Sequence, residues 1–221
     1  TMTVNGNLTV GTNARLVTTS PTVIAGNGGS ISVKGNIINT GTITSNGVTG
    51  TLSNFIISGA SAQTFSNTGT FSGGTLLFTM NNPAGLTLLT QLTLPWNADF
   101  VAGKITTTAA NILTMVDNAV YTGGSTNSFV SGPMQKIGDE DFIFPVGKGA
   151  IYAPVSLTGG SGAMSTDIFT AEYIRNNPQS VYGNVYEVLA PPNNIDHVSF
   201  VEYWTITRDA GTAGKFVTLT V

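Results

Sequence analysis

The sequence predicts an all-β protein, in which a parallel β-solenoid is followed by an antiparallel β-sandwich. Three observations predict this fold class. Short runs of Val, Ile, Leu, Phe and Thr alternate with polar residues and end at Gly or Asn, whereas apolar residues at helical spacing are nearly absent. Segments of the first half recur at a nearly fixed interval, as stacked turns require. Charged residues make up only 9% of the chain, while Thr and Gly are abundant, with 34 and 27 copies.

Two pairs of segments define the repeat. Val4–Leu8 (VNGNL) returns as Val33–Ile37 (VKGNI) 29 positions later, and Asn39–Ile43 (NTGTI) returns as Asn67–Phe71 (NTGTF) 28 positions later. Inside these units a step of six residues separates apolar residues in two sets: Ile31, Ile37 and Ile43, and then Phe65, Phe71 and Leu77. We expect each short strand to place one or two apolar side chains inside the coil. A corner at Gly or Asn follows, because these residues tolerate positive φ.

Stacking explains the unusual composition. Turns of a solenoid lie ~4.8 Å apart and pair through main-chain hydrogen bonds, so that equivalent side chains lie above one another. Asn and Thr bond to their copies in the next turn, whereas like charges ~5 Å apart repel. With ~20–28 residues in each turn, residues 1–130 give about five or six turns and a rod ~25–30 Å long. An ordinary Thr-rich antiparallel sandwich is the alternative fold for this part.

Charge divides the chain into two parts. Residues 1–138 carry four basic and two acidic residues, whereas residues 139–221 carry four basic and nine acidic residues. A shift of this kind usually marks a domain boundary. We place it within residues 131–138, so that residues 1–134 form the solenoid and residues 135–221 form the sandwich. Both ends of the sequence have strand patterns, and we expect a segment of a larger protein whose sandwich is truncated at its C-terminal end.

Composition excludes several classes of function. The chain has no Cys and one His, which excludes disulfides, iron–sulfur clusters, a thiol nucleophile and the usual Cys/His zinc cages. With 8 Lys and Arg in a chain of net charge −3, phosphate neutralisation is poorly supplied, and we expect no nucleic-acid partner. No apolar run approaches the ~20 residues of a membrane helix, so we expect no membrane insertion.

The acidic residues provide few candidates for chemistry, and we predict no catalytic and no cofactor-binding residue. Glycoside hydrolysis needs two facing carboxylates, but residues 1–138 offer only Asp99 and Asp117, 18 positions apart. Asp139, Glu140 and Asp141 form the one dense acidic run. Hard cations such as calcium prefer several oxygen ligands, so these three residues are calcium candidates. The alternative is a solvated turn before a strand, because the spacing of an EF-hand loop is missing.

Exposed aromatic side chains are the best candidates for contacts with glycans. A ring face packs on the apolar C–H surface of a sugar, while polar groups at the ring edge form hydrogen bonds. The candidates are Trp96, Tyr121, Tyr152 and Tyr182. The alternative for each of them is a place in the hydrophobic core.

Two stretches carry motifs of a known family. The first is Gly138–Lys148, which contains FIFPVG at Phe142–Gly147, and the second is Val201–Arg208 (VEYWTITR). They resemble the large repetitive, β-helical and adhesin-like cell-surface proteins of Bacteroidota that are exported by the type IX secretion system. The resemblance covers residues 135–221 and extends to residues 1–130 only in style. It implies a β-helical repeat region that opens into a β-sandwich and a location outside the cell, but no catalytic activity.

From these observations we expect a non-enzymatic extracellular module, structural or adhesive, within a longer surface protein or filament. Its partners would be neighbouring domains of the same chain, copies of itself that stack into a fibre, or surface glycans. The alternative is a carbohydrate-binding or carbohydrate-active β-helix with its site on the solenoid face or outside this segment. Two acids that line one groove would favour the alternative, and their absence would favour the stalk.

Overall fold

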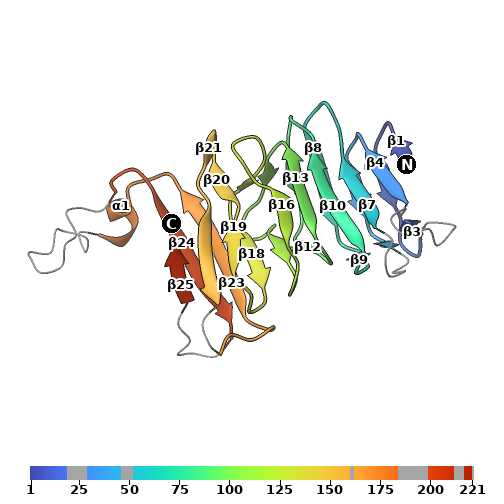
Figure 1. Cartoon of the computed structure of the whole chain (residues 1–221). Helices are drawn as coiled ribbons and strands as arrows, with labels where there is room; N and C mark the ends of the chain where they lie inside the picture. Colours follow the sequence, from blue (N-terminus) through green and yellow to red (C-terminus); the bar gives the residue numbers. More distant parts are fainter. Residues whose placement is uncertain (19–28, 46–51, 160–161, 184–198, 212–216, 221) are drawn as a thin grey trace, which may run out of the picture.

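The computed structural model describes residues 1–18, 29–45, 52–159, 162–183, 199–211 and 217–220. These residues form short β-strands and one four-residue helix, α1 (Gln179–Tyr182). The strands up to β18 follow one another in a coil with three strands in each turn, and strands of successive turns pair in parallel (Figure 1). The parallel β-solenoid that the sequence predicts is therefore present, and it makes about five turns.

The coil has three faces. The first face is a six-stranded parallel sheet of β1 (Met2–Val4), β4 (Ser30–Val33), β7 (Ser53–Ile57), β10 (Leu76–Asn81), β13 (Ala98–Ala102) and β16 (Tyr121–Gly123). The second face stacks β2 (Leu8–Val10), β5 (Ile37–Asn39), β8 (Gln63–Asn67), β11 (Leu86–Leu88), β14 (Ile105–Thr106), β17 (Val130–Ser131) and β20 (Val146–Lys148), and ends with the antiparallel β21 (Ile151–Tyr152). The third face begins with β3 (Arg15–Thr18), β6 (Thr42–Ser45) and β9 (Thr70–Ser72).

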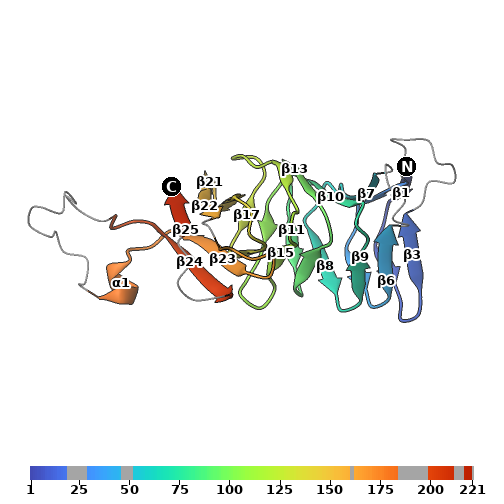
Figure 2. The same ribbon diagram turned by 60° about the horizontal axis from the view of Figure 1, so that its bottom comes forward.

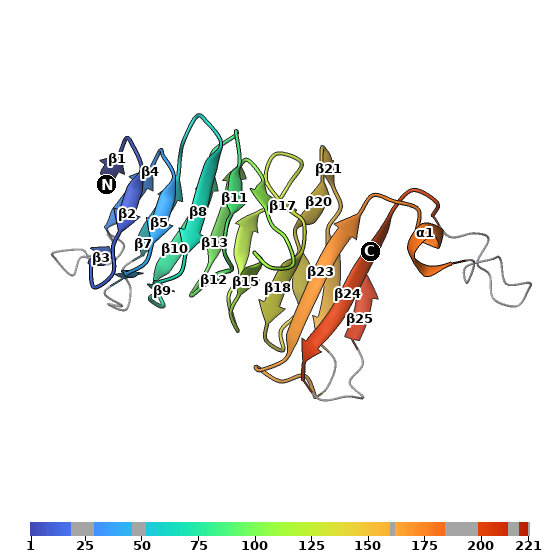
Figure 3. The same cartoon turned by 180° about the vertical axis from the view of Figure 1, so that it is seen from behind.

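The third face also joins the coil to the antiparallel part. A second ladder continues this face with β12 (Leu92–Leu94), β15 (Leu113–Met115), β18 (Met134–Ile137), β23 (Ile168–Ile174) and β24 (Tyr203–Ala210). We call these five strands the junction sheet, because pairing is parallel up to β18 and antiparallel from β18 onward (Figure 3). Main-chain pairing thus runs through residue 135, and a division into two domains at that point stays a prediction.

A second antiparallel sheet lies beside the end of the coil. This closing sheet consists of β19 (Phe142–Phe144), β22 (Val155–Gly159) and β25 (Val217–Thr220). Residues of both antiparallel sheets belong to the buried cluster: Phe142, Phe144, Val155 and Leu157 from the closing sheet, and Phe169, Ala171 and Tyr173 from the junction sheet. The closing sheet and the junction-sheet strands β23 and β24 lie in the part of the chain that the sequence predicts as a sandwich, whereas β20 and β21 of that part belong to the second face.

Strand register confirms the sequence repeats. Val4 pairs with Val33, and Leu8 pairs with Ile37. Asn39 lies beside Asn67 on the second face, at the predicted interval of 28 residues. The interval is not constant along the coil, because Leu86 pairs with Ile105 only 19 positions later. Corners therefore vary in length while the strands stay aligned.

The step of six places one apolar residue on each face of a turn. Ile31, Ile37 and Ile43 are at most 5% exposed and belong to β4, β5 and β6. Phe55, Phe65 and Phe71 fill the next turn, with ring centroids 5.4–6.0 Å apart. The step ends there: Leu77 is only half-buried, because its neighbours Leu76 and Phe78 point inward instead.

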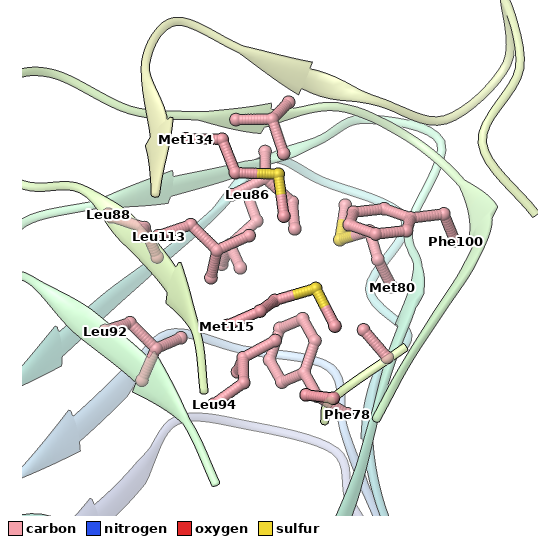
Figure 4. Packing of buried hydrophobic residues seen from close by; sticks show 14 of the residues in the cluster. Phe78, Met80, Leu86, Leu88, Leu92, Leu94, Phe100, Leu113, Met115 and Met134 are labelled. Carbon is pink, nitrogen blue, oxygen red and sulfur yellow. The ribbon is translucent and has the colours of Figure 1, made fainter. Parts of the chain in front are cut away.

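Further along, flexible side chains replace the phenylalanines. Figure 4 shows Met80, Met115 and Met134, which come from the first and third faces, among leucines from the second and third faces. All three methionines are fully buried. Because Met adapts its shape to irregular gaps, it suits an interior in which turn length changes.

Polar ladders form as the stacking model predicts. The buried Asn39 donates from Nδ2 to Oδ1 of Asn67 at 2.7 Å and to the carbonyl oxygen of Thr70 at 2.9 Å. On another corner, the side-chain oxygens of Asn7 and Asn36 accept hydrogen bonds from the main-chain N–H groups of Asn36 and Thr64, each at 2.9 Å. Asn thus links one turn to the next through both its side chain and its backbone.

Some corner glycines are required for a reason other than the predicted one. Gly103 and Gly123 have positive φ, as expected for corners. Gly41 and Gly69 do not, yet a Cβ at Gly69 would lie 2.2 Å from the carbonyl oxygen of Gly41. At these two stacked corners the backbones of successive turns approach so closely that no side chain fits between them.

The family-like motifs are strands of the antiparallel part. Phe142 and Phe144 are buried and Ile143 is 53% exposed, so the strand alternates as expected. Trp204 donates from Nε1 to the carbonyl oxygen of Ala153 at 2.9 Å and packs against the core, whereas Tyr203 packs against Tyr182 on α1. The two adjacent aromatic residues therefore point to opposite sides of the strand.

The described residues include no helix with the length and apolar character needed to cross a bilayer.

We predict that Gly69→Ala destabilises the fold by about 2–3 kcal/mol, because the added methyl group forces two stacked main chains apart. Gly74→Ala is the matched control, since a Cβ at Gly74 meets nothing within 4 Å and its φ is not positive. Urea denaturation followed by circular dichroism measures both changes. Equal unfolding midpoints for the two variants would contradict the close approach of the corners.

Candidate functional site

The predicted acidic cluster lies where the coil ends, but its membership differs from the prediction. Carboxylate oxygens of Asp117, Asp139 and Glu140 all lie within 4.8 Å of one another, and Asp141 is outside this group. Asp117 joins because it directly follows β15, the strand that pairs with β18 before the acidic run. A Cβ at Gly138 would lie 2.0 Å from Oε2 of Glu140, so this glycine gives the carboxylates their room.

A buried lysine already neutralises part of this cluster. Lys136 is 2% exposed, and its ammonium group forms an ion pair with Glu140. It also donates to the carbonyl oxygens of Val116 at 2.9 Å and Ile137 at 2.5 Å. A cation would have to compete with Lys136 for Glu140, although Asp117 and Asp139 supply the oxygens that calcium prefers. Calcium binding at these residues stays a prediction.

Asp99 and Asp117 belong to different faces of the coil. Asp99 is on β13 of the first face and accepts a hydrogen bond from the Thr122 hydroxyl at 2.7 Å, whereas Asp117 follows β15 of the third face. Two carboxylates on different faces of a filled coil cannot flank one sugar ring, so this pair is not a glycosidase site.

Two of the four aromatic candidates are packed into the wall at the end of the coil. Tyr121 makes edge-on contacts with Phe100 and Phe142, with centroids 5.5 and 5.7 Å apart. Burial, followed by interaction with Tyr152, raises the pKa of Tyr121. Tyr152 lies against Phe129 at 6.0 Å. These contacts hold both rings in place and leave them less available to a ligand.

The other two candidates are more accessible. Trp96 is half-buried at the corner between β12 and β13. Tyr182, at the end of α1, is 46% exposed and lies edge-on to Tyr203, with centroids 5.8 Å apart. Tyr182 therefore extends the outer surface of the junction sheet, to which Tyr203 belongs.

That outer surface holds a groove that the sequence analysis did not identify. The groove has a volume of about 400 Å³, and we call it the junction groove. It is lined by Gln91, Ala109, Ile112, Pro133, Gln135, Thr170, Glu172, Thr205 and Asp209. Two acids, Glu172 and Asp209, thus line one groove on strands β23 and β24.

Hydrogen bonds across four strands fix the polar side chains of the junction groove. Asp209 accepts from Gln135 Nε2 at 3.1 Å, from the Thr170 hydroxyl, and from the Thr207 hydroxyl at 3.0 Å. Gln135 in turn accepts from the Thr114 hydroxyl at 3.1 Å. The network runs from the parallel strand β15 to the antiparallel strand β24, so the change in pairing does not interrupt it.

Glu172 differs from Asp209 in its surroundings. Burial raises the pKa of Glu172, and the nearby Lys148 opposes that shift. Tyr203 also has a raised pKa, caused first by burial and then by Tyr182 and Glu172. Glu172 therefore lines the junction groove and also lies near Tyr203. Among the described residues, none donates a hydrogen bond to the Glu172 carboxylate.

Local sequence reasoning missed the junction groove because register creates it. Alternation along VEYWTITR does place Tyr203, Thr205 and Thr207 on one side of a strand. Only the antiparallel pairing of Glu172 with Thr205 brings the second acid to the same surface. No spacing within either strand contains this information.

A larger hollow lies between the first and second faces and is less suited to chemistry. Its volume is about 660 Å³, and Lys104 is its one charged lining residue. The Lys104 ammonium group bonds to the carbonyl oxygen of Gly149 and lies 5.1 Å from the centre of the Phe129 ring. Its charge is thus engaged within the protein.

No family model, curated protein or solved structure matches this chain.

We predict that Glu172→Gln stabilises the protein at neutral pH relative to the parent. The folded chain releases the Glu172 proton at a higher pH than the unfolded chain, whose pKa is near the ordinary value of 4.5. Stability is therefore lost as the pH rises from about 4.5 through the folded pKa, and glutamine removes this loss. Thermal melts between about pH 4 and pH 8 measure the difference, with Asp99→Asn as the control carboxylate. A difference that does not grow with pH would contradict the burial of Glu172.

Proposed function

We propose that this chain is a non-enzymatic structural and adhesive module of a longer extracellular protein, secreted or held at the cell surface. The observation that supports this function best is the main-chain pairing along the rod. The second face pairs without a gap from β2 to β21, and the junction sheet pairs from β12 in the coil to β24 in the antiparallel part. The two sheets overlap along the rod, so hydrogen-bonded backbone supports a load over most of its length.

Shape supports the same proposal. β1 lies at one end of the long axis and β24 lies toward the other, with the turns of the coil between them (Figure 2). Each turn contacts mainly its neighbours, so the rod resists extension as a series of stacked units. The interior is filled with apolar side chains on all three faces. Neighbouring domains of the same chain, or copies of it, are the partners that such a spacer would join.

The motif resemblance supports a location outside the cell. The FIFPVG stretch forms β19 and the start of β20, and VEYWTITR contributes most of β24. Both motifs thus belong to the end of the coil, as they do in the adhesin-like proteins of Bacteroidota that they resemble. Export through the type IX secretion system is part of this proposal.

Single-molecule pulling between the two ends tests the mechanical role. We expect stepwise unfolding, in which the release of one turn of ~20–28 residues lengthens the chain by about 70–100 Å. Asn39→Asp should lower the resisting force, because it buries a carboxylate against the Thr70 carbonyl oxygen and removes the donor to Asn67. Asn127→Asp, at an exposed position, is the matched control. Extension with no resisting step would contradict the proposal.

A carbohydrate-binding or carbohydrate-active β-helix is the second candidate function, and one observation favours it. Glu172 and Asp209 line the same groove, and glycoside hydrolysis uses a pair of carboxylates that flank the scissile bond. Against catalysis, Asp209 accepts three hydrogen bonds from protein groups, so about one of the roughly four acceptor positions of its carboxylate remains for a ligand.

We predict that the chain releases no new reducing ends from soluble neutral polysaccharides such as xylan and glucomannan. A reducing-sugar assay over prolonged incubation measures this. Release that disappears in both Glu172→Gln and Asp209→Asn, but persists in Asp99→Asn, would contradict a non-enzymatic function and establish the junction groove as an active site.

A further inference from the structure

The junction groove combines the two kinds of surface that a sugar presents. Its lining includes three apolar residues, Ala109, Ile112 and Pro133, and a polar set of Gln135, Thr170 and the two carboxylates, which we call the polar rim. A pyranose ring has apolar C–H faces and a belt of hydroxyl groups, so it matches a lining of both kinds. A purely apolar ligand would leave the polar rim unpaired, which costs binding free energy.

The polar rim is rigid before any ligand arrives. Asp209 and Gln135 are held by hydrogen bonds to three threonines of β15, β23 and β24. Side chains that are already ordered lose little entropy on binding. The Glu172 carboxylate, which receives no hydrogen bond from a described residue, remains able to accept one from a ligand hydroxyl.

An aromatic platform continues the groove along β24. Tyr203 lies two residues before Thr205 on the same side of the strand, and the exposed ring of Tyr182 stands edge-on to it. Glu172 acts electrostatically on Tyr203, and Tyr203 contacts Tyr182. Ring faces beside hydrogen-bonding acids are the arrangement in which a sugar packs and bonds at once.

Size and charge narrow the ligand class. The junction sheet spans four strand spacings, or about 19 Å from β12 to β24, which accommodates several sugar units laid across the strands. Two carboxylates repel an acidic polysaccharide or a nucleic acid, and Lys148 only partly offsets the effect of burial on Glu172. A neutral ligand avoids this repulsion.

We propose that the outer surface of the junction sheet binds a neutral, hydroxyl-rich oligosaccharide, with its hydroxyl groups on Glu172, Asp209 and Gln135 and its ring faces on Tyr203 and Tyr182. This inference rests on the adhesive part of the proposed function and assigns that part to a defined surface. It does not depend on the mechanical part, which the pulling experiment measures separately.

Isothermal titration calorimetry with four hexasaccharides tests the proposal. The neutral probes are xylohexaose, cellohexaose and mannohexaose, and hexagalacturonate is the acidic probe. We expect at least one neutral probe to bind the parent chain and hexagalacturonate not to bind. Tyr203→Ala and Tyr182→Ala should each weaken binding about five- to tenfold, while Tyr203→Phe and Tyr182→Phe should retain it, because phenylalanine keeps the ring face.

Two carboxylate variants separate this surface from the rest of the molecule. Asp209→Asn should weaken binding at least about fivefold, and Asp99→Asn, on the first face, should leave it unchanged. Tyr182 is exposed on α1, so Tyr182→Ala reports on the ring platform even if Tyr203→Ala does not fold. Binding of no neutral probe, tighter binding of hexagalacturonate, or tyrosine variants that bind like the parent would each overturn the proposal.

Discussion

Parallel stacking in register is the constraint on which the rest of this structure depends. It places each residue directly above its equivalent in the previous turn, so a side chain must be compatible with a copy or close relative of itself. Apolar side chains, Asn and hydroxyl groups meet this condition, and Asn39 above Asn67 is the clearest case. Charges do not. In the described part of the chain, the buried charged residues are Lys136 and Asp167, and both lie where parallel stacking ends.

The same constraint explains where functional groups gather. Antiparallel strands place unlike residues opposite one another, and nine of the eleven acidic residues of the chain follow β18. The acidic cluster around Glu140, the ion pair with Lys136 and the junction groove all lie at this transition. The coil supplies length and rigidity, and the antiparallel end supplies chemical variety. The separation of a rigid coil from a chemically varied end is thus a direct result of the change in strand pairing.

Much of the fold could be predicted from the sequence, because segments that repeat along the chain are the ones that pair with each other in successive turns. The pairing of Val4 with Val33 and of Asn39 with Asn67 follows from identical residues at equivalent positions of the repeats. The site could not be predicted in the same way. Asp117 reaches Glu140 only because one turn lies on another, and Glu172 reaches the groove of Asp209 only through antiparallel register. The requirement for Gly69 was equally hidden, since close approach of two main chains leaves no conformational signature in a single turn.

The number of residues between paired positions varies along the coil, and this variation has a consequence for the evolution of the protein. The interval between equivalent residues falls from 29 between Leu8 and Ile37 to 19 between Leu86 and Ile105, yet both pairs stay aligned. Corners therefore absorb insertions and deletions that would disrupt most sheets. A lineage can remodel the loops at the corners while the stacked strands are preserved. A protein engineer can likewise graft foreign peptides at these corners and obtain a rigid display rod.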